Sequence, residues 1–441
     1  MTCAAEVGEV RMASTTSAHR LGPRSLRSGR RHDDRATVAE GAQVHASRPR
    51  VLLTIRLLSR RCGGAERMYA ELANGLASCG YPVHCVYCDA GEAPPFYDFA
   101  PAVSLKNLRG RRARRKAGYR LLDLLGRAYP AVPAAAPLAW LAKNLFFAVQ
   151  LAAEVRRRRP DVVISFLPPA NTVSLLVGLA TGCKVIPTNH GVPELDYASE
   201  QRWDQNPVDR WLRLRLLRFA ARIHVLSDAF VPWFSTQLQQ RVVPIPNGVA
   251  ADFRAPSSEL ERQPEVIAVG RLVPEKNHLV LLEAWSQIAH RHPHWRLRIF
   301  GDGPLREALE RRIGEHDLRE SVLLAGEDNH MEQVYSRASI LCHPSLHEGF
   351  GLAVAEALAC GVPVVAFSDC SGVKDLVRHG ADGYLVERDG GAAGLAAALD
   401  HLISNHKERE RMSRNALEGG RRFGVDRFVA DWCSLINEVA T

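Results

Sequence analysis

"RPRVLLTIRLLSRRCGGAERMYAELANGLASCGYPVHCVYCD", residues 48–89, contains the pattern that decides the fold class. Residues 48–58 form an apolar run typical of a buried strand. A glycine loop, an amphipathic helical pattern and a second apolar run follow in that order. Two strands joined through a helix are parallel, because the helix carries the chain back to the starting edge of the sheet. The stretch therefore predicts the start of a parallel α/β sheet.

The same alternation continues along the first half of the chain. Further strands are expected at "PDVVISFL" (160–167), "CKVIPTNHG" (183–191) and "ARIHVLS" (221–227), with helical patterns between them. We therefore expect residues 48–242 to form one doubly wound, Rossmann-like domain. Residues 1–47 carry arginine, acid, serine and glycine without an apolar run, which predicts a disordered tail outside the fold.

A segment rich in proline and glycine, "VVPIPNGVAADF" (242–253), is interpreted as a linker, after which the alternation restarts. Strands are expected at 264–270, 295–303, 321–326, 338–345, 363–368 and 383–387. Residues 243–424 are therefore predicted to form a second Rossmann-like domain. The amphipathic helical pattern at 425–439 lies beyond the second sheet, and we expect residues 425–441 to pack back on the first domain.

The bulk composition is that of a globular protein with an excess of basic side chains. The chain has 441 residues, 46% of them hydrophobic, and a net charge of +9, so an acidic or phosphorylated partner is expected. Its ten cysteines show no framework spacing and are interpreted as reduced thiols of a cytosolic protein. Cys85 and Cys88 form an isolated C-x-x-C in an apolar run, and core packing explains them better than zinc, which needs four ligands.

The sequence contains no segment that reads as a secretory signal or as a membrane span. The most membrane-like stretch, residues 128–155, is interrupted by Lys143. The uncharged runs on either side of this lysine fall short of the roughly 18 residues that a spanning helix needs.

Two loops that follow predicted strands have residues suited to an anion. Gly63 and Gly64 come directly before a helix, where backbone N–H groups can face a phosphate, although the pair is also common in plain tight turns. "GRLVPEKN" (270–277) carries Arg271 and Lys276, the two cations that bind phosphate most often. A solvated loop with no specific role is the alternative for this second segment.

A third loop lies in "HPSLHEGFGLAVAEALACGVPVV", residues 343–365, where a strand ends, two glycines turn the chain and a helix begins at about 351. The backbone amides of Phe350, Gly351 and Leu352 then lie at a helix N-terminus, which favours an anion. Glu348 stays on the loop, and Glu356 lies about one turn into the helix. A carboxylate in the second position can accept hydrogen bonds from vicinal ribose hydroxyls. The two histidines do not have the helical H-E-x-x-H spacing, so a metal is not expected.

In this order, "GGAER", "GRLVPEKN", "GDGP" and "HEGFGLAVAEALACGVPVVA" resemble the family-4 retaining glycosyltransferases of the GT-B fold. The resemblance extends from about 49 to 440, and the stretch "PDVVISFLPPANTVSLLVGLA" further resembles bacterial enzymes of exopolysaccharide and lipid-linked glycan synthesis. It implies two Rossmann-like domains facing across a cleft, a nucleotide-diphosphate sugar donor with UDP as the expected nucleotide, and a glycan or polyprenyl-diphosphate-linked acceptor.

The resemblance also implies roles for individual residues. Arg271 and Lys276 would hold the diphosphate and neutralise the leaving group, and Glu356 would bind the ribose. Glu348 and the loop Gly349, Phe350, Gly351 and Leu352 would contact the donor sugar and its β-phosphate. Gly63 and Gly64 would let the first domain approach the diphosphate.

His190, in "TNHG", matches a first-domain position that faces the reacting sugar in the family. A capping or core histidine is the alternative for this residue. Two stretches depart from the family pattern: "PTNHGVPE" around His190, and "DCSGVKDLV", which has the single Gly372 and Asp375 where the family has a glycine pair and a glutamate. Both departures concern the identity of the donor sugar rather than the reaction.

The mechanism implied by the resemblance is metal-independent and uses no cofactor, because cations and helix amides stabilise the leaving diphosphate. Three alternatives to a glycosyltransferase are a GT-B-like sugar-nucleotide epimerase, a Rossmann dehydrogenase and a catalytically inactive sugar-binding subunit. The E-x7-E turn argues against an epimerase, and the first glycine loop lacks the G-x-G-x-x-G spacing of a dehydrogenase. Intact Glu348, Glu356, Arg271 and Lys276 argue against an inactive subunit.

Basic clusters at 109–116 and 156–159 flank the apolar helical stretch 133–155. One interpretation is a buried core helix with solvated arginines at its ends. The other is peripheral attachment of a cytoplasmic protein to anionic lipid on the inner face of the membrane, where such clusters are attracted. No nucleic-acid partner is expected.

Overall fold

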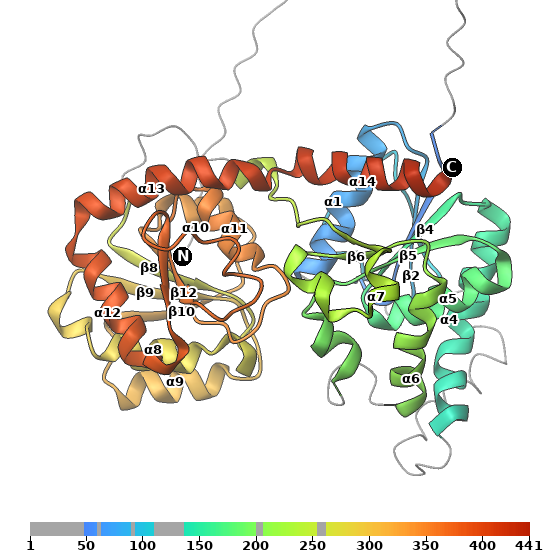
Figure 1. The fold of residues 1–441 in the computed structure, drawn as a ribbon. Coiled ribbons are helices and arrows are strands. Elements are labelled where there is room, and N and C mark those ends of the chain that lie inside the picture. The colour runs from blue at the N-terminus through green and yellow to red at the C-terminus, as the bar shows by residue number, and fades with distance from the viewer. Residues whose placement is uncertain (1–47, 60–62, 90–92, 110–135, 200–205, 254–261) are drawn as a thin grey trace, which may run out of the picture. The chain divides into compact units, whose positions relative to one another are not determined.

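The computed structural model describes residues 48–59, 63–89, 93–109, 136–199, 206–253 and 262–441. The predicted tail at 1–47 and most of the basic cluster at 109–116 lie outside the described residues. The described chain contains two parallel β-sheets with helices packed against them (Figure 1).

The first sheet has seven strands in the order β3-β2-β1-β4-β5-β6-β7, and every pairing is parallel. Its strands are β1 (Val51–Ile55), β2 (Val83–Tyr87), β3 (Ser104–Asn107), β4 (Val162–Phe166), β5 (Lys184–Thr188), β6 (Ile223–Val225) and β7 (Val242–Pro244). All five residues of β1, β2 and β4 are buried, as expected for strands covered by helices on both faces.

The second sheet has six strands in the order β10-β9-β8-β11-β12-β13, again all parallel. Its strands are β8 (Glu265–Val269), β9 (Arg296–Phe300), β10 (Val322–Gly326), β11 (Ile340–His343), β12 (Val364–Phe367) and β13 (Gly383–Val386). The fold prediction of two doubly wound sheets in tandem is confirmed.

The helices alternate with these strands along the chain. They are α1 (Gly64–Ser78), α4 (Ala136–Arg158), α5 (Pro168–Thr181), α6 (Pro207–Leu216), α7 (Thr236–Gln239), α8 (His278–Ser286), α9 (Arg306–Glu315), α10 (Met331–Arg337), α11 (Leu352–Ala359), α12 (Gly391–Ser404), α13 (His406–Gly420) and α14 (Val425–Ala440). Among the described helices none is both long and apolar enough to cross a bilayer.

The two edge strands of the first sheet differ from the sequence interpretation. The segment 242–253 was interpreted as a linker, but its first three residues form β7 beside β6. Proline and glycine misled the interpretation, because an edge strand tolerates proline, which has no N–H to donate to a neighbour. Strand β3, beside β2, was missed because "SLKN" is short and only partly buried.

Helix α14 lies along α1 and completes the apolar core of the first sheet (Figure 1). Phe428, Trp432 and Ile436 are buried in the same cluster as the side chains of β1 and β2. The Tyr81 hydroxyl donates to Asn437 Oδ1 at 2.9 Å. The last helix therefore packs on the domain that contains the first sheet.

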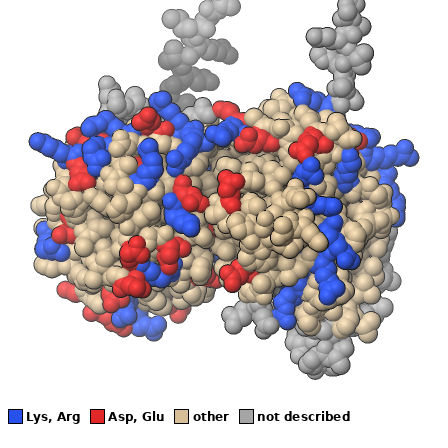
Figure 2. Space-filling model, viewed as in Figure 1, with Lys and Arg blue, Asp and Glu red and all other residues tan. Residues whose placement is uncertain are grey.

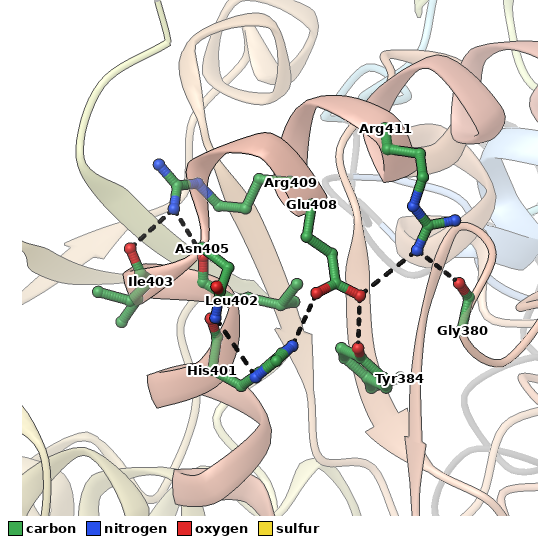
Figure 3. A network of polar contacts seen from close by, with 9 residues as sticks. All are labelled: Gly380, Tyr384, His401, Leu402, Ile403, Asn405, Glu408, Arg409 and Arg411. Atoms are coloured by element: carbon green, nitrogen blue, oxygen red, sulfur yellow. Dashed lines mark hydrogen bonds and ion pairs between the residues drawn. The ribbon is translucent and has the colours of Figure 1, made fainter.

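A polar network fixes the junction of α12 and α13 (Figure 3). The Glu408 carboxylate accepts hydrogen bonds from the Tyr384 hydroxyl at 2.7 Å and from His401 Nε2 at 2.7 Å. Arg409 Nη1 donates to the carbonyl oxygens of Leu402 and Ile403, which belong to the last turn of α12. These contacts satisfy carbonyl groups that a helix end leaves without partners.

Candidate functional site

Two of the loops with predicted site residues follow β8 and β11, which are neighbours in the second sheet. In each sheet the strand order reverses direction at one pair, β1 with β4 and β8 with β11. Ligands of open α/β sheets bind beyond the carboxyl ends of the strands at this point. The loops after β8 and β11 are joined there by a hydrogen bond from the Leu346 amide to the Glu275 carbonyl, 2.8 Å long.

A cavity of about 890 Å³ lies beside these loops. All eleven residues assigned to the site from the sequence line it: Gly63, Gly64, His190, Arg271, Lys276, Glu348, Gly349, Phe350, Gly351, Leu352 and Glu356. They come from four segments that are far apart in sequence, each a loop or the start of the helix after it, so the fold brings together the residues that the motifs singled out.

Glu348 lies in a compact cluster of charge. Its carboxylate contacts the Lys276 ammonium, and His343 Nε2 lies 2.8 Å from its Oε1 atom. Burial by itself would raise the pKa of Glu348, but Lys276 and His343 together hold that pKa well below its usual range. Glu348 is therefore a carboxylate at neutral pH. The sequence analysis missed His343, although its position as the last residue of a buried strand at the switch point was a usable signal.

Arg271 differs from Lys276 in its surroundings. Its side chain is exposed where it lines the cavity, and within the described residues it forms no ion pair. An arginine without a carboxylate partner can bind a phosphate without first breaking an ion pair. Of the two cations in the loop after β8, Lys276 is therefore paired and Arg271, among the described residues, is not.

The glycines of the loop after β11 allow close packing and a sharp turn. Gly351 is the N-cap of α11 with φ at +85°, a left-handed conformation that favours glycine. A Cβ atom on Gly349 would lie 2.4 Å from the His190 carbonyl oxygen, so only glycine fits there. The predicted start of the helix at about 351 is confirmed.

Glu356 is buried in α11, with 6% of its side chain exposed. Its Oε1 atom accepts a hydrogen bond from Arg67 Nη1 at 2.5 Å. Burial raises the pKa of Glu356, and Arg67 and the Tyr335 hydroxyl only partly offset this effect. The sequence analysis expected this carboxylate to accept hydrogen bonds from ribose hydroxyls, and in the structure its Oε1 atom already accepts one from Arg67.

Arg67 was missed by the sequence analysis. It lies on the first turn of α1, three residues after Gly64, and its guanidinium also lies over the Phe253 ring at 4.7 Å from the ring centre. Arg67 therefore lines the cavity and connects α1 of the first domain to Glu356 on α11 of the second.

His190 stacks on Phe166, with the ring centres 4.8 Å apart and the planes inclined by 17°. Neither ring nitrogen has a hydrogen-bond partner in the described part of the chain, which does not fit the capping alternative. Burial, with a smaller effect of His224, holds the pKa of His190 well below its usual range. The imidazole is therefore neutral at pH 7 and lines the cavity as a polar but uncharged group.

The loop after β4 contains a strained residue. Leu167 has φ at +71° and ψ at 148°, a region that glycine alone adopts readily. It follows Phe166, the ring on which His190 stacks, and its carbonyl oxygen accepts from the amides of Ala170 and Asn171. Backbone strain thus occurs at the switch point of the first sheet.

The first sheet's side of the cavity also carries polar and aromatic residues that the motifs did not mark. Glu71, Asn74, Phe96 and Asp98 line it, and Asn74 Nδ2 donates to the Asp98 carbonyl at 3.0 Å. Phe96 is 42% exposed. Within the described ranges no group of three or more histidine, cysteine, aspartate or glutamate side chains could hold a metal ion.

Two family models match the chain. Residues 62–253 match the family described as Glycosyltransferase Family 4, and residues 250–419 match the family described as Glycosyl transferases group 1. Together the two matches run from before α1 into α13.

Among curated proteins, the chain is similar to an exopolysaccharide phosphotransferase of Streptomyces coelicolor, with 35% identity over 49% of this chain and 23% of that protein. It is 33% identical to an uncharacterized glycosyltransferase of Haemophilus influenzae over 39% of this chain and 48% of that protein. The chain thus spans half or less of these two relatives. A third relative is the Campylobacter jejuni GalNAc-alpha-(1->4)-GalNAc-alpha-(1->3)-diNAcBac-PP-undecaprenol alpha-1,4-N-acetyl-D-galactosaminyltransferase, 25% identical over 86% of this chain and 96% of that protein.

Solved structures share the fold. HepE of Anabaena, in complex with UDP and glucose, has a TM-score of 0.67 and 18% identity over 88% of this chain and 100% of its own. Sucrose-phosphate synthase of Thermosynechococcus elongatus has a TM-score of 0.71 and 20% identity over 88% of this chain and 98% of its own.

Proposed function

Given that the chain belongs to the GT-B glycosyltransferases, we propose that it is a retaining enzyme that transfers a sugar from a nucleotide-diphosphate donor to a saccharide acceptor. The donor nucleotide is UDP, as in the complexes of HepE. The acceptor is a glycan or a saccharide on a polyprenyl diphosphate, in line with the name of the Campylobacter relative.

One observation carries the proposal. The cavity combines the unpaired Arg271, the Lys276–Glu348 pair and the N-terminus of α11. A diphosphate needs positive groups on several sides, and its charge grows as the sugar leaves. Fixed donors are most effective for such a group, because they need no reorganisation during the reaction.

In this assignment the residues divide the donor among them. Arg271 and Lys276 bind the diphosphate, Glu348 contacts the sugar, and Glu356 binds the ribose beside Arg67. The glycines 63, 64, 349 and 351, with Phe350 and Leu352, form the close walls around the phosphate and the sugar. The neutral His190 faces the sugar from the other wall and donates or accepts one hydrogen bond.

The reaction breaks the bond between the anomeric carbon and the β-phosphate oxygen and forms one to the acceptor hydroxyl on the same face. The acceptor proton passes to the leaving phosphate, so no second enzyme carboxylate is required. The Lys276 side chain balances the charge that appears on the phosphate. Asn74, Phe96 and Asp98, on the first sheet's side, are the groups we assign to the acceptor.

The test is a thermal-shift screen of the full chain against UDP-, GDP-, ADP- and dTDP-sugars. A ligand that binds only the folded state stabilises it by RT ln(1 + [L]/Kd), about 2.7 kcal/mol at a hundredfold excess over Kd. The UDP-sugars should shift the melting temperature most. No shift with any nucleotide sugar would contradict the proposal.

Product analysis separates the rival readings. A glycosyltransferase releases UDP in step with a new glycosidic bond of retained configuration, which NMR of the anomeric proton detects. An epimerase releases an altered free sugar or sugar nucleotide and needs no acceptor. An inactive sugar-binding subunit shows the thermal shift with neither product.

The cellular place of the protein is also a proposal. We infer a cytoplasmic enzyme held peripherally at the inner face of the membrane, because a lipid-linked acceptor is presented there. Arg111, Arg112, Arg114 and Arg115 of the first basic cluster lie outside the described residues. The second cluster, 156–159, is exposed at the end of α4.

A further inference from the structure

Exposed apolar side chains are concentrated in one part of the molecule. Eleven large apolar residues of the described chain are exposed, and eight of these belong to α4, α5, α6 and the turn Leu217–Phe219 that follows α6. Single exposed apolar residues need no explanation, but a cluster on adjoining elements marks a surface that contacts something apolar.

On α4 these side chains form a stripe. Leu138, Leu141, Leu145 and Val149 are 71%, 47%, 39% and 53% exposed. Their spacing of three and four residues puts them on one side of a helix. The opposite side of α4 is buried through Phe147, Leu151 and Val155 in the core of the first sheet.

The neighbouring helix α6 and the turn that follows it carry aromatic residues together with arginines. Trp211 and Phe219 are 56% and 45% exposed, and between them lies Leu214, 41% exposed. Arg215 lies over the Trp211 ring and Arg218 over the Phe219 ring, at 4.6 and 4.7 Å from the ring centres. Figure 2, in the orientation of Figure 1, shows a row of basic side chains over this side of the first sheet's domain.

The two helices are in contact. Trp140 Nε1 on α4 donates to Asp209 Oδ1 on α6 at 2.8 Å. We call the exposed side chains of both helices and the following turn, namely Leu138, Leu141, Leu145, Val149, Trp211, Leu214, Arg215, Arg218 and Phe219, the α4–α6 face.

Acidic groups are withdrawn from this face. The sequence of α4 contains one acid, Glu154, and that of α6 contains one, Asp209, and both are buried. Glu154 accepts from Arg157 at 2.6 Å and Asp209 accepts from Arg213 at 2.5 Å. The net charge presented to solvent by the two helices is therefore positive.

We propose that the α4–α6 face docks on an anionic lipid bilayer, with its leucine and aromatic side chains at the level of the headgroups and its arginines against lipid phosphates. Apolar stripes, exposed tryptophan and flanking arginine without acid are the combination that an interfacial helix uses. A protein partner of this chemistry would need an acidic apolar surface, whereas an anionic bilayer supplies both features everywhere. The choice of a bilayer rests on the proposed function through its lipid-linked acceptor.

This face differs from the attachment inferred from sequence. That interpretation relied on the arginine clusters and did not say which side of the apolar helix between them faces the membrane. The structure divides α4 into a buried side and an exposed side, and adds α6, which the sequence analysis did not mark.

The test is co-sedimentation of the full chain with vesicles of phosphatidylglycerol and phosphatidylethanolamine, against phosphatidylcholine vesicles, at low and high salt. The apolar variant replaces Leu141, Val149 and Trp211 with serine, and the charge variant replaces Arg215 and Arg218 with serine. Matched controls on the second sheet's domain are Leu323→Ser, at a side chain 53% exposed like Val149, and Arg311→Ser. All replaced side chains are exposed, so melting temperatures should stay near wild type.

We expect wild type to prefer the anionic vesicles. The apolar variant should lose roughly tenfold or more of its partition coefficient at both salt concentrations, because the buried apolar area determines that part of the binding. The charge variant should lose roughly tenfold at low salt and little at high salt, because screening already removes its contribution. The controls should bind as wild type does.

Three results would overturn the inference: wild type that ignores anionic vesicles at low salt, an apolar variant that binds like wild type, or a dimer that the apolar variant converts to monomer in light scattering. UDP-sugar thermal shifts are measured on the same samples without vesicles. If the shifts are absent but vesicle binding follows the variants, the proposed function fails and the docking face stands. The opposite result rejects the face alone.

Discussion

Glu348 and Glu356 belong to the same turn-and-helix segment, yet their electrostatic environments are opposite. Glu348 lies against Lys276 and His343, which hold its pKa well below the usual range. Glu356 is buried in α11 with Arg67 as its nearest cation, and burial raises its pKa. The two ends of the cavity therefore hold carboxylates of unequal acidity.

The difference supports our proposal that the two glutamates have different tasks. A carboxylate fixed between a lysine and a histidine is a permanent charge that orients and balances cations near a reacting centre. A buried carboxylate with one arginine is suited to accept neutral hydroxyl donors such as those of ribose. Changes at the Glu348 end should therefore affect the chemical step, and changes at the Glu356 end should affect binding.

The largest effect is expected for Lys276→Ala. The variant removes the cation that contacts Glu348 and that we assign to the leaving phosphate, so kcat/KM should fall by about 10²-fold or more. Arg271→Ala should cause a loss of the same order. Lys407→Ala, at an exposed lysine of α13, is the control and should behave as wild type. Near-normal turnover of the Lys276 variant would remove the distinction between the two ends.

A smaller effect is expected for Glu356→Gln, which keeps the size of the side chain and an acceptor for Arg67. The ribose contact is made equally in the ground state and the transition state, so KM for the donor should rise roughly tenfold while kcat changes little. Initial rates over a range of donor concentrations measure both constants. A normal KM with a strongly reduced kcat would contradict the ribose assignment.

The contributions of the two glutamates to the free energy of unfolding should depend on pH with opposite signs. Glu348 has a folded pKa below its unfolded value, so its charged form stabilises the fold above about pH 4.3 and loses that contribution as the pH falls further. Glu348→Gln should therefore lower the free energy of unfolding at pH 7.5 by about 2 kcal/mol, and by less at pH 3.5.

Glu356 has a folded pKa above its unfolded value, so its contribution is largest below about pH 4.3 and falls as the pH rises through the folded pKa. Glu356→Gln should therefore change the stability at pH 7.5 by less than about 1 kcal/mol. Urea unfolding of both variants and wild type at the two pH values measures the difference. Equal losses at pH 7.5 would mean that the two environments are alike.

The smallest effect is expected for metal removal. Because Arg271 and Lys276 are assigned the role of the cation, excess EDTA should leave the initial rate unchanged. A loss of activity that a divalent ion restores would show that a metal ion also binds the diphosphate at the Glu348 end of the cavity.

The sequence by itself determined the fold class and eleven of the residues that line the cavity. Apolar runs alternating with helical patterns specify parallel sheets covered on both faces, because only such sheets bury entire strands. The glycine turns and the cations after β8 and β11 could be recognised locally, since the loops at the carboxyl ends of strands are set by their own residues. The short edge strands β3 and β7 carry too little apolar sequence to be recognised in this way.

Only the tertiary structure decided the partners of those residues. Arg67 meets Glu356 across 289 positions of sequence, and Lys276 meets Glu348 across 72, so neither contact has a local signature. The same holds for the stacking of His190 on Phe166 and for the division of α4 into a buried and an exposed side. The physical reason is that pKa values and burial depend on neighbours in space, and the packing of helices and sheets brings these together from distant parts of the chain.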